Sequence, residues 1–194
     1  MQMPLDAQVD IPDDALLVLY ANGDQSAARI LTLRLTPKVF GHAFRMLGDR
    51  AEAEDVTQDA LIRLWKIAPE WRQGEAKVTT WLYRVVANLC TDRLRKVRGV
   101  DIDSIPEPED DSTGPAETLQ DKARVDALQA ALNELPERQR QAVVLRHIEG
   151  LSNPEISEIM DIGVEAVESL TARGKRALTK ALAGRRAELG YSDD

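Results

Sequence analysis

Cysteine and histidine are scarce in this sequence of 194 residues, which contains one cysteine, Cys90, and two histidines. A single cysteine excludes an intrachain disulfide, and nothing in this composition resembles a zinc site. Cys90 lies within a predicted helix, residues 79–97, where we expect a buried, unreactive thiol. A redox role or a partner contact is the alternative. We expect no metal and no other cofactor.

Long apolar runs and alternating β-branched segments are also missing. No uninterrupted apolar run approaches the roughly 20 residues that cross a bilayer. Residues 1–14 are acidic and have neither the basic start nor the apolar stretch of a signal peptide, so we expect a cytoplasmic protein. Apolar residues recur at spacings of three and four, and aromatic residues make up only 4% of the chain. This pattern favours an all-α fold.

The net charge of −8 is unevenly distributed. Residues 99–118 contain seven acidic side chains, no basic one and three prolines, a composition typical of a flexible linker. Residues 1–98 carry 14 basic and 13 acidic side chains, and residues 119–194 carry 11 and 13. We therefore expect two small helical domains joined by an acidic linker. The expected parts are a disordered arm (1–13), an N-terminal domain (14–98), the linker (99–118), a C-terminal domain (119–185) and a tail (186–194).

Local signals predict where the helices of the N-terminal domain begin and end. Asp24 is suited to cap a helical stretch, which Pro37 should end or kink. Asp49 and Glu52 form a capping-box pattern directly before a predicted helix over residues 51–67.

Residues 79–97 predict a helix with one apolar side and one basic, amide-bearing side. The second side steps by three and four residues through Trp81, Arg84, Asn88, Thr91 and Arg95. An exposed tryptophan can stack on a base, an amide can bind a base edge, and guanidinium groups can bind phosphates. Such a helix could hold separated DNA strands. The alternative is a core tryptophan with scattered surface charge.

Residues 152–182 are typical of a helix-turn-helix. Ser152 and Glu155 form a capping box, and Ile162 is the apolar residue that such turns bury between their helices. The second helix begins near Val164. Its inward residues are predicted to be Val167, Leu170 or Thr171, Gly174, Leu178 and Leu182.

The outward face of this second helix would enter the major groove of DNA. Ser169 and Arg173 could meet base edges there, and arginine is suited to guanine. Glu165 and Glu168 share the face but would repel phosphates. The side chains expected to contact phosphates are Lys175, Arg176 and Lys180. A plain helical hairpin with solvated charges is the alternative.

Four stretches, in order, resemble one known family. They are GDRAEAEDVTQDALIRLW (48–65), TWLYRVVANLCTDRLRK (80–96), LPERQRQAVVLRHIEGLSNPEISEIM (135–160) and VEAVESLTARGKRAL (164–178). They are similar to motifs of the extracytoplasmic-function (ECF) group of bacterial RNA polymerase sigma factors, over roughly residues 14–182. The resemblance implies a transcription initiation factor that binds core RNA polymerase, directs it to promoter DNA and promotes melting. It also implies an anti-sigma factor as inhibitor.

The resemblance assigns roles to individual residues. The clamp helices of the polymerase β′ subunit would bind Asp55, Gln58, Asp59, Leu61, Leu64 and Trp65. The −10 element, with a flipped base, would contact Arg72, Lys77, Thr79, Trp81, Arg84, Asn88, Thr91 and Arg95. The −35 element would contact Ser169, Ala172, Arg173, Lys175 and Arg176. Three residues of the second helix differ from those usual in the family, namely Glu168, Leu170 and Thr171. The family resemblance therefore does not predict which −35 sequence is read.

Two other functions fit parts of the sequence. An autonomous helix-turn-helix regulator would bind duplex DNA tightly without polymerase, which the nearly neutral charge of residues 119–194 disfavours. A protein-binding adaptor would use the same faces to sequester a partner. The sequence offers no nucleophile–base pair and no phosphate-binding glycine loop, so we expect a protein without enzymatic activity.

Overall fold

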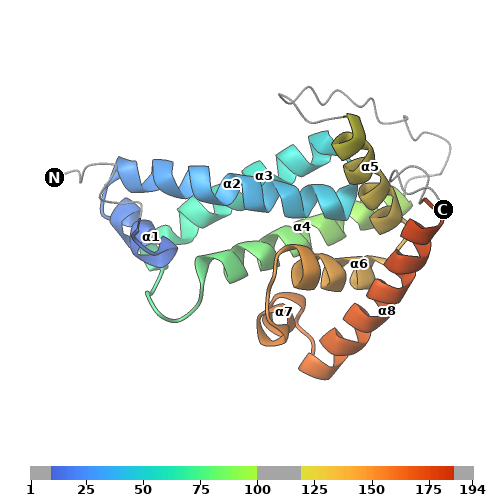
Figure 1. Cartoon of the computed structure of the whole chain (residues 1–194). Helices are drawn as coiled ribbons and strands as arrows, with labels where there is room; N and C mark the ends of the chain where they lie inside the picture. Colours follow the sequence, from blue (N-terminus) through green and yellow to red (C-terminus); the bar gives the residue numbers. More distant parts are fainter. Residues whose placement is uncertain (1–9, 100–118, 186–194) are drawn as a thin grey trace.

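A computed structural model describes residues 10–99 and 119–185, and in these residues all regular structure is helical, which confirms the expected all-α fold. The predicted arm up to residue 9, the linker from residue 100 and the tail from residue 186 lie outside the described residues. Figure 1 shows the helices of the N-terminal domain, which are α1 (Asp13–Ala21), α2 (Gln25–Leu47), α3 (Arg50–Ile67), the 3₁₀ turn η2 (Ala68–Glu70) and α4 (Val78–Gly99).

Side-chain caps begin α2 and α3 where the sequence predicts them. The Asp24 carboxylate accepts a hydrogen bond from the backbone N–H of Ser26 at 2.8 Å. The Asp49 carboxylate accepts one from the backbone N–H of Glu52 at 2.9 Å. The expected capping box at Asp49 is only half formed, because the Glu52 carboxylate bonds to Arg93 of α4 instead. That bond ties the start of α3 to α4.

Pro37 is predicted to end or kink a helix, and the end does not occur, because α2 continues through this residue to Leu47. Pro37 is exposed, and so is Leu33, whose carbonyl oxygen loses its helical partner at this point. Water can therefore reach the carbonyl. The opposite side of α2 is held in the core by Leu35 and Val39, each 1% exposed.

The core of the N-terminal domain lies between α2, α3 and α4, with α1 packed against α2. Its largest fully buried apolar side chains are Leu16, Leu17, Leu31, Leu35, Met46, Leu64 and Leu82. Cys90 belongs to this core at 0% exposure, and burial raises the pKa of its thiol to about 12. The expected buried, protonated thiol is confirmed.

The C-terminal domain contains α5 (Leu119–Asn133), α6 (Glu137–Val143), the π-helical turn η3 (Val144–Ile148), α7 (Asn153–Met160) and α8 (Val164–Ala183). The predicted helix-turn-helix corresponds to α7 and α8, and the capping box of Ser152 and Glu155 is complete. Asp161 adopts a left-handed conformation (φ 52°) in the turn, and Ile162 is half-buried against the core as expected. A short polar side chain tolerates this conformation better than most residues do.

The two domains are in direct contact. Figure 1 shows α7 beside α4, and the end of α2 beside α5. A second apolar cluster combines Tyr83 and Ala87 of α4 with residues of the C-terminal domain, namely Leu145, Ile156, Ile159 and Val167. The face of α4 that is turned away from its own domain core is therefore partly covered by the helix-turn-helix.

Candidate nucleic-acid interface

The outward face of α8 is open to solvent in the part of the chain that the structure describes. All five predicted −35 residues are exposed: Ser169, Ala172, Arg173, Lys175 and Arg176. Val167 and Gly174, predicted to face inward, are buried. The helical phase inferred from the sequence is therefore confirmed, and α8 presents a continuous polar surface to a ligand.

Glu168 lies on this exposed surface and has a neighbour on the preceding helix. The side-chain amide of Asn153, at the start of α7, donates a hydrogen bond to the Glu168 carboxylate at 3.4 Å. This contact links the exposed carboxylate of Glu168 to the start of α7. A carboxylate held there can accept a hydrogen bond from the amino group of cytosine.

The polar face of α4 is more enclosed than that of α8. Arg84, Asn88 and Arg95 are exposed as predicted, whereas Thr91 is half-buried. The Thr91 hydroxyl donates a hydrogen bond to the Glu137 carboxylate of the C-terminal domain at 2.8 Å. A cleft of about 720 Å³ separates the domains here, and it is lined by Asn88, Thr91, Arg95 and Arg98 of α4.

Trp81 is half-buried and not exposed as predicted. Its ring is half-buried against the N-terminal core and meets Trp71 edge-on, with ring centroids 6.2 Å apart. The spacing of polar residues on α4 placed Trp81 correctly on their side. It did not show that the loop before α4 brings a second tryptophan across to cover part of the ring.

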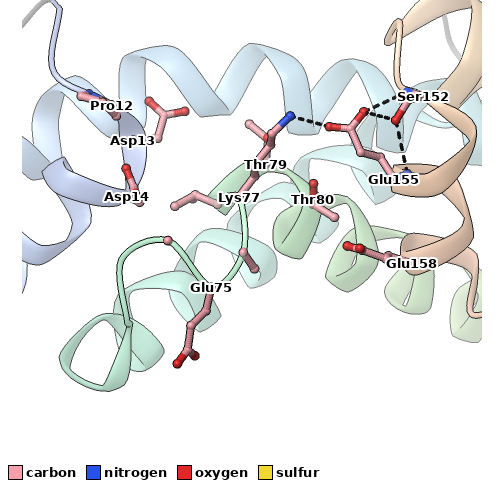
Figure 2. A pocket seen from close by; sticks show the side chains of 13 residues that line it. Pro12, Asp13, Asp14, Glu75, Lys77, Thr79, Thr80, Ser152, Glu155 and Glu158 are labelled. Carbon is pink, nitrogen blue, oxygen red and sulfur yellow. Dashed lines mark hydrogen bonds and ion pairs between the residues drawn. The ribbon is translucent and has the colours of Figure 1, made fainter.

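The loop between η2 and α4 and the first turn of α4 carry the remaining predicted −10 residues. Arg72 is exposed and pairs with Glu75 at 3.6 Å, and Thr79 is half-buried. The Lys77 ammonium donates a hydrogen bond to the Glu155 carboxylate at 2.6 Å. Lys77 and Glu155 both line a cavity of about 660 Å³. Figure 2 shows their hydrogen bond at the edge of this cavity.

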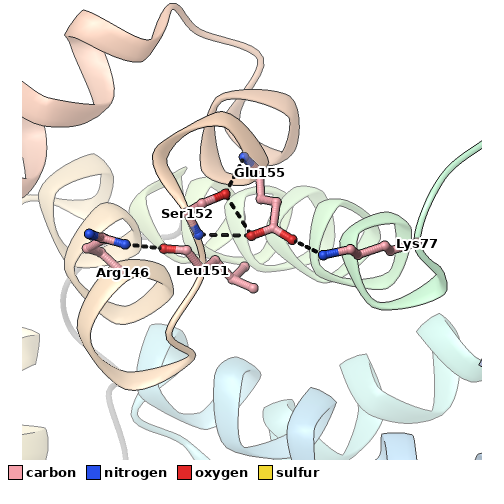
Figure 3. Close-up of polar contacts among 5 residues, drawn as sticks. All are labelled: Lys77, Arg146, Leu151, Ser152 and Glu155. Carbon is pink, nitrogen blue, oxygen red and sulfur yellow. Dashed lines mark hydrogen bonds and ion pairs between the residues drawn. The ribbon is translucent and has the colours of Figure 1, made fainter.

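Glu155 makes contacts both within its own domain and with the N-terminal domain, as Figure 3 shows. It completes the cap of α7 by accepting hydrogen bonds from the backbone N–H of Ser152 at 2.9 Å and from the Ser152 hydroxyl at 2.8 Å. It also pairs with Lys77 of the N-terminal domain. The hydrogen bond from Lys77, followed by those from Ser152, lowers the pKa of Glu155 to about 2. The same bond raises the pKa of Lys77, so both groups are charged at neutral pH.

The surface of α3 contains the predicted polymerase-binding residues. Asp55, Gln58 and Asp59 are exposed, and Leu61 and Trp65 are half-buried. Arg93 of α4 lies beside the two aspartates, at 3.9 Å from Asp55 and 3.5 Å from Asp59. Trp65 packs edge-on against Tyr20, with centroids 4.9 Å apart.

Leu64 does not belong to this surface. It is 0% exposed and lies in the core of the N-terminal domain. Its predicted role as a contact residue is therefore wrong, and Leu64 packs beneath the surface of α3. Sequence reasoning missed Ile62, which is 43% exposed on α3. The signal was available, because Ile62 falls outside the helical spacing that buries Val56, Ala60 and Leu64.

Sequence reasoning also missed three glutamates of the C-terminal domain that contact the N-terminal domain: Glu137, Glu149 and Glu155. Their partners are up to 104 residues away in sequence, and helical periodicity carries no information over such separations. Among the described residues there is no group of three or more potential metal ligands. In the same residues we find no helix long and apolar enough to span a membrane.

Comparison with known proteins matches both domains. Residues 31–99 match the Sigma-70 region 2 family, and residues 126–178 match the Sigma-70 region 4 family. The chain is 32% identical to the ECF RNA polymerase sigma factor SigE of Mycolicibacterium smegmatis, over 90% of this chain and 70% of SigE. It is also 32% identical to the ECF RNA polymerase sigma factor SigW of Bacillus subtilis, over 82% of this chain and 91% of SigW.

Solved structures share the fold. CnrH, solved in complex with the cytosolic domain of CnrY, superposes with a TM-score of 0.65 at 23% identity, covering 89% of this chain and 97% of CnrH. The sigma factor RpoE of Bartonella quintana, solved with the anti-sigma factor NepR, gives a TM-score of 0.62 at 22% identity, covering 78% and 94%. The shared fold, together with the matches to region 2 and region 4, defines a two-domain sigma-70-type protein. The chain belongs to the ECF RNA polymerase sigma factors.

Proposed function

We propose that this sigma factor reads promoter DNA with two surfaces, one on each domain, while α3 binds core RNA polymerase. The observation that carries the proposal is the outward face of α8, where five predicted contact residues are exposed together. Recognition helices of this kind insert their N-terminal part into the major groove. Ser169 and Arg173 would read bases of the −35 element, and Lys175 and Arg176 would bind phosphates.

The N-terminal domain would contact the −10 element. Arg84, Asn88 and Arg95 are exposed along one side of α4, and Lys77 is exposed in the preceding loop. Guanidinium and ammonium groups would hold the backbone, and Asn88 would bind a base edge of a separated strand. Trp81 would act mainly by packing the loop against Trp71, because only part of its ring is accessible.

The polymerase would bind a strip of apolar side chains on the surface of α3. Leu61, Ile62 and Trp65 offer accessible apolar surface, bordered by the carboxylates of Asp55 and Asp59. An apolar centre with a charged rim is the usual composition of a specific protein interface. We place Ile62 in this strip and Leu64 beneath it.

The remaining parts of the proposal concern organisation and control. The chain would consist of the domains 14–98 and 119–185 joined by the acidic linker, and it would act in the cytoplasm. The polymerase would supply all of the chemistry. RpoE of Bartonella quintana binds the anti-sigma factor NepR, and we propose an anti-sigma partner for this chain as well. Such a partner would compete for the surfaces on α3, α4 and α8.

Run-off transcription with purified core polymerase tests the proposal. Core polymerase plus this chain should start discrete transcripts on genomic fragments, and core polymerase alone should not. If no discrete transcript appears, and the chain alone protects duplex DNA from nuclease, the protein is an autonomous regulator. If it neither starts transcripts nor protects DNA, the protein-binding adaptor is the better interpretation.

A further inference from the structure

Three carboxylates of the C-terminal domain bind donors around the DNA-facing side of the N-terminal domain. Glu137 accepts hydrogen bonds from Thr91 at 2.8 Å and Arg98 at 3.1 Å. Glu155 accepts one from Lys77 at 2.6 Å. Lys77 and Thr91 are two of the donors proposed above for the −10 strand.

Glu149 provides the third contact. It accepts a hydrogen bond from the Tyr83 hydroxyl at 2.7 Å and pairs with Arg45 of α2 at 3.5 Å. Burial, together with the hydrogen bond to Glu149, raises the pKa of Tyr83. The phenol therefore stays protonated and remains a donor at any physiological pH.

Apolar packing lies between these polar contacts. Tyr83 is 5% and Ala87 is 4% exposed, although both lie on the side of α4 that faces away from its own domain core. They are covered by Leu145, Ile156 and Ile159 of the C-terminal domain. A small apolar centre surrounded by ion pairs is the composition of a specific but separable interface.

The end of α2 is completed by the other domain as well. The last carbonyl groups of a helix have no partner within it. The Arg140 guanidinium donates a hydrogen bond to the carbonyl oxygen of Met46 at 2.6 Å, and the Gln129 amide donates one to that of Arg45 at 3.3 Å. Both donors belong to the C-terminal domain.

We infer that the C-terminal domain is an intramolecular competitor for the −10 strand. Its glutamate carboxylates bind the donors that promoter phosphates need, while α8 remains open. The inference rests on the proposed function, because it concerns the regulation of the same surface. The Thr91 hydroxyl has one proton, so it cannot donate to Glu137 and to a phosphate oxygen at once. At Lys77 the Glu155 carboxylate offsets the positive charge and repels a phosphate, so the −10 strand and the C-terminal domain compete at both residues.

With the C-terminal domain packed on α4, the two DNA-reading surfaces of the free chain are not equally accessible to DNA. The α8 surface can bind DNA at once, whereas the α4 surface requires the C-terminal domain to move away. Binding to a polymerase that holds the two domains apart would open the α4 surface. Such a chain would melt DNA only when it is in the holoenzyme.

The test is a triple variant, Glu137→Gln, Glu149→Gln and Glu155→Gln, in the full chain without polymerase. Glutamine keeps the side-chain size, and at position 155 it can still complete the capping box. The matched control changes three exposed carboxylates of the C-terminal domain for which the described residues show no hydrogen bond or ion pair to the N-terminal domain: Asp126→Asn, Glu134→Gln and Asp161→Asn. Both variants lose three negative charges.

Two measurements compare the three proteins. The first is the affinity for a fluorescent single strand of about 20 nucleotides with random sequence, measured by anisotropy at low salt. The interface variant should bind about tenfold more tightly than the charge-matched control. The second is hydroxyl-radical labelling of Tyr83, with Tyr20 as an internal reference. Labelling of Tyr83 should rise in the interface variant alone.

Equal affinity of the two variants, or equal labelling of Tyr83 in all three proteins, overturns the inference. Run-off transcription with core polymerase separates this outcome from failure of the proposed function. If all three proteins direct transcription but bind the single strand equally, only the intramolecular competition is wrong. If none directs transcription, the proposed function itself is wrong.

Discussion

At the scale of single residues, His42 shows how burial sets protonation. It is 0% exposed in α2, and its ring meets Tyr83 edge-on with centroids 5.2 Å apart. Neither ring nitrogen has a hydrogen-bond partner among the described residues. Burial, with a smaller contribution from the charge of Arg45, lowers the pKa of His42 to about 3. The neutral ring is thus part of the core beside the domain contact.

Protonation of His42 should make the free energy of unfolding sensitive to mild acid. The folded-state pKa is below the unfolded value of about 6.5, so the unfolded chain binds the extra proton and stability falls as pH drops below 6.5. Between about pH 7.5 and pH 5 the loss from this group should be about 2 kcal/mol. Urea unfolding of the wild type and of His42→Phe at both pH values measures it. An equal loss in both proteins would show that His42 is not the titrating group.

Arg173 is the residue on which direct base reading depends most. Arg173→Ala should weaken use of the −35 element by about 1–3 kcal/mol if the guanidinium makes a bidentate contact with guanine. Transcription from promoters with intact and altered −35 elements measures this loss. Lys175→Ala is the comparison, because removal of a phosphate contact should weaken all promoters alike. A uniform effect of Arg173→Ala would reassign it to the phosphates.

At the scale of elements, helix starts and helical phases could be predicted, because caps and periodicity are local. Asp24, Asp49 and Ser152 each cap a helix where the sequence indicates it. Of the end or kink predicted at Pro37, the end does not occur, and the freed carbonyl belongs to Leu33 on the exposed side of α2. Leu64 was misassigned because the resemblance gave a role to a position that the helical phase of α3 places in the core.

The packing of α6 against α8 depends on Gly174. A Cβ atom there would lie 2.5 Å from the Val143 side chain and 2.9 Å from the carbonyl oxygen of Gln139. Gly174→Ala should therefore lower the free energy of unfolding by about 1–3 kcal/mol. Gly184→Ala is the control, because its Cβ would make only an ordinary contact of 3.5 Å. Chemical unfolding compares the two, and equal stability would contradict the tight packing.

The exposed position of Asn88 on the polar face of α4 leads to a prediction about DNA melting. Asn88→Ala should prevent open-complex formation while leaving polymerase binding intact, because Asn88 is exposed on α4 and the polymerase strip lies on α3. Permanganate reactivity of promoter thymines measures melting, and co-elution with core polymerase measures binding. Asp92→Asn, an exposed substitution one turn further along α4, is the control. Equal loss of melting and binding would show that Asn88 supports the fold of the polymerase site.

At the scale of the whole molecule, the all-α class and the family could be predicted from four ordered motifs, but the contact between the domains could not. Glu137, Glu149 and Glu155 lie 39 to 104 residues from their partners. In sequence they are ordinary helix-flanking acids. The packing of the C-terminal domain against the N-terminal domain brings them to Lys77, Tyr83 and Thr91. The nearly neutral charge of residues 119–194 already disfavours tight DNA binding by the free chain, and the proposed competition would add a structural cause.

Association with core RNA polymerase tests the central claim most directly. The purified chain, mixed at micromolar concentration with core polymerase freed of other sigma factors, should co-elute with it from a sizing column as one chain per polymerase. Ile62→Glu, which places a charge in the apolar strip of α3, should weaken this association. If the unaltered chain elutes alone, while the same core polymerase binds another sigma factor, the account of this protein as a polymerase-delivered promoter reader is contradicted.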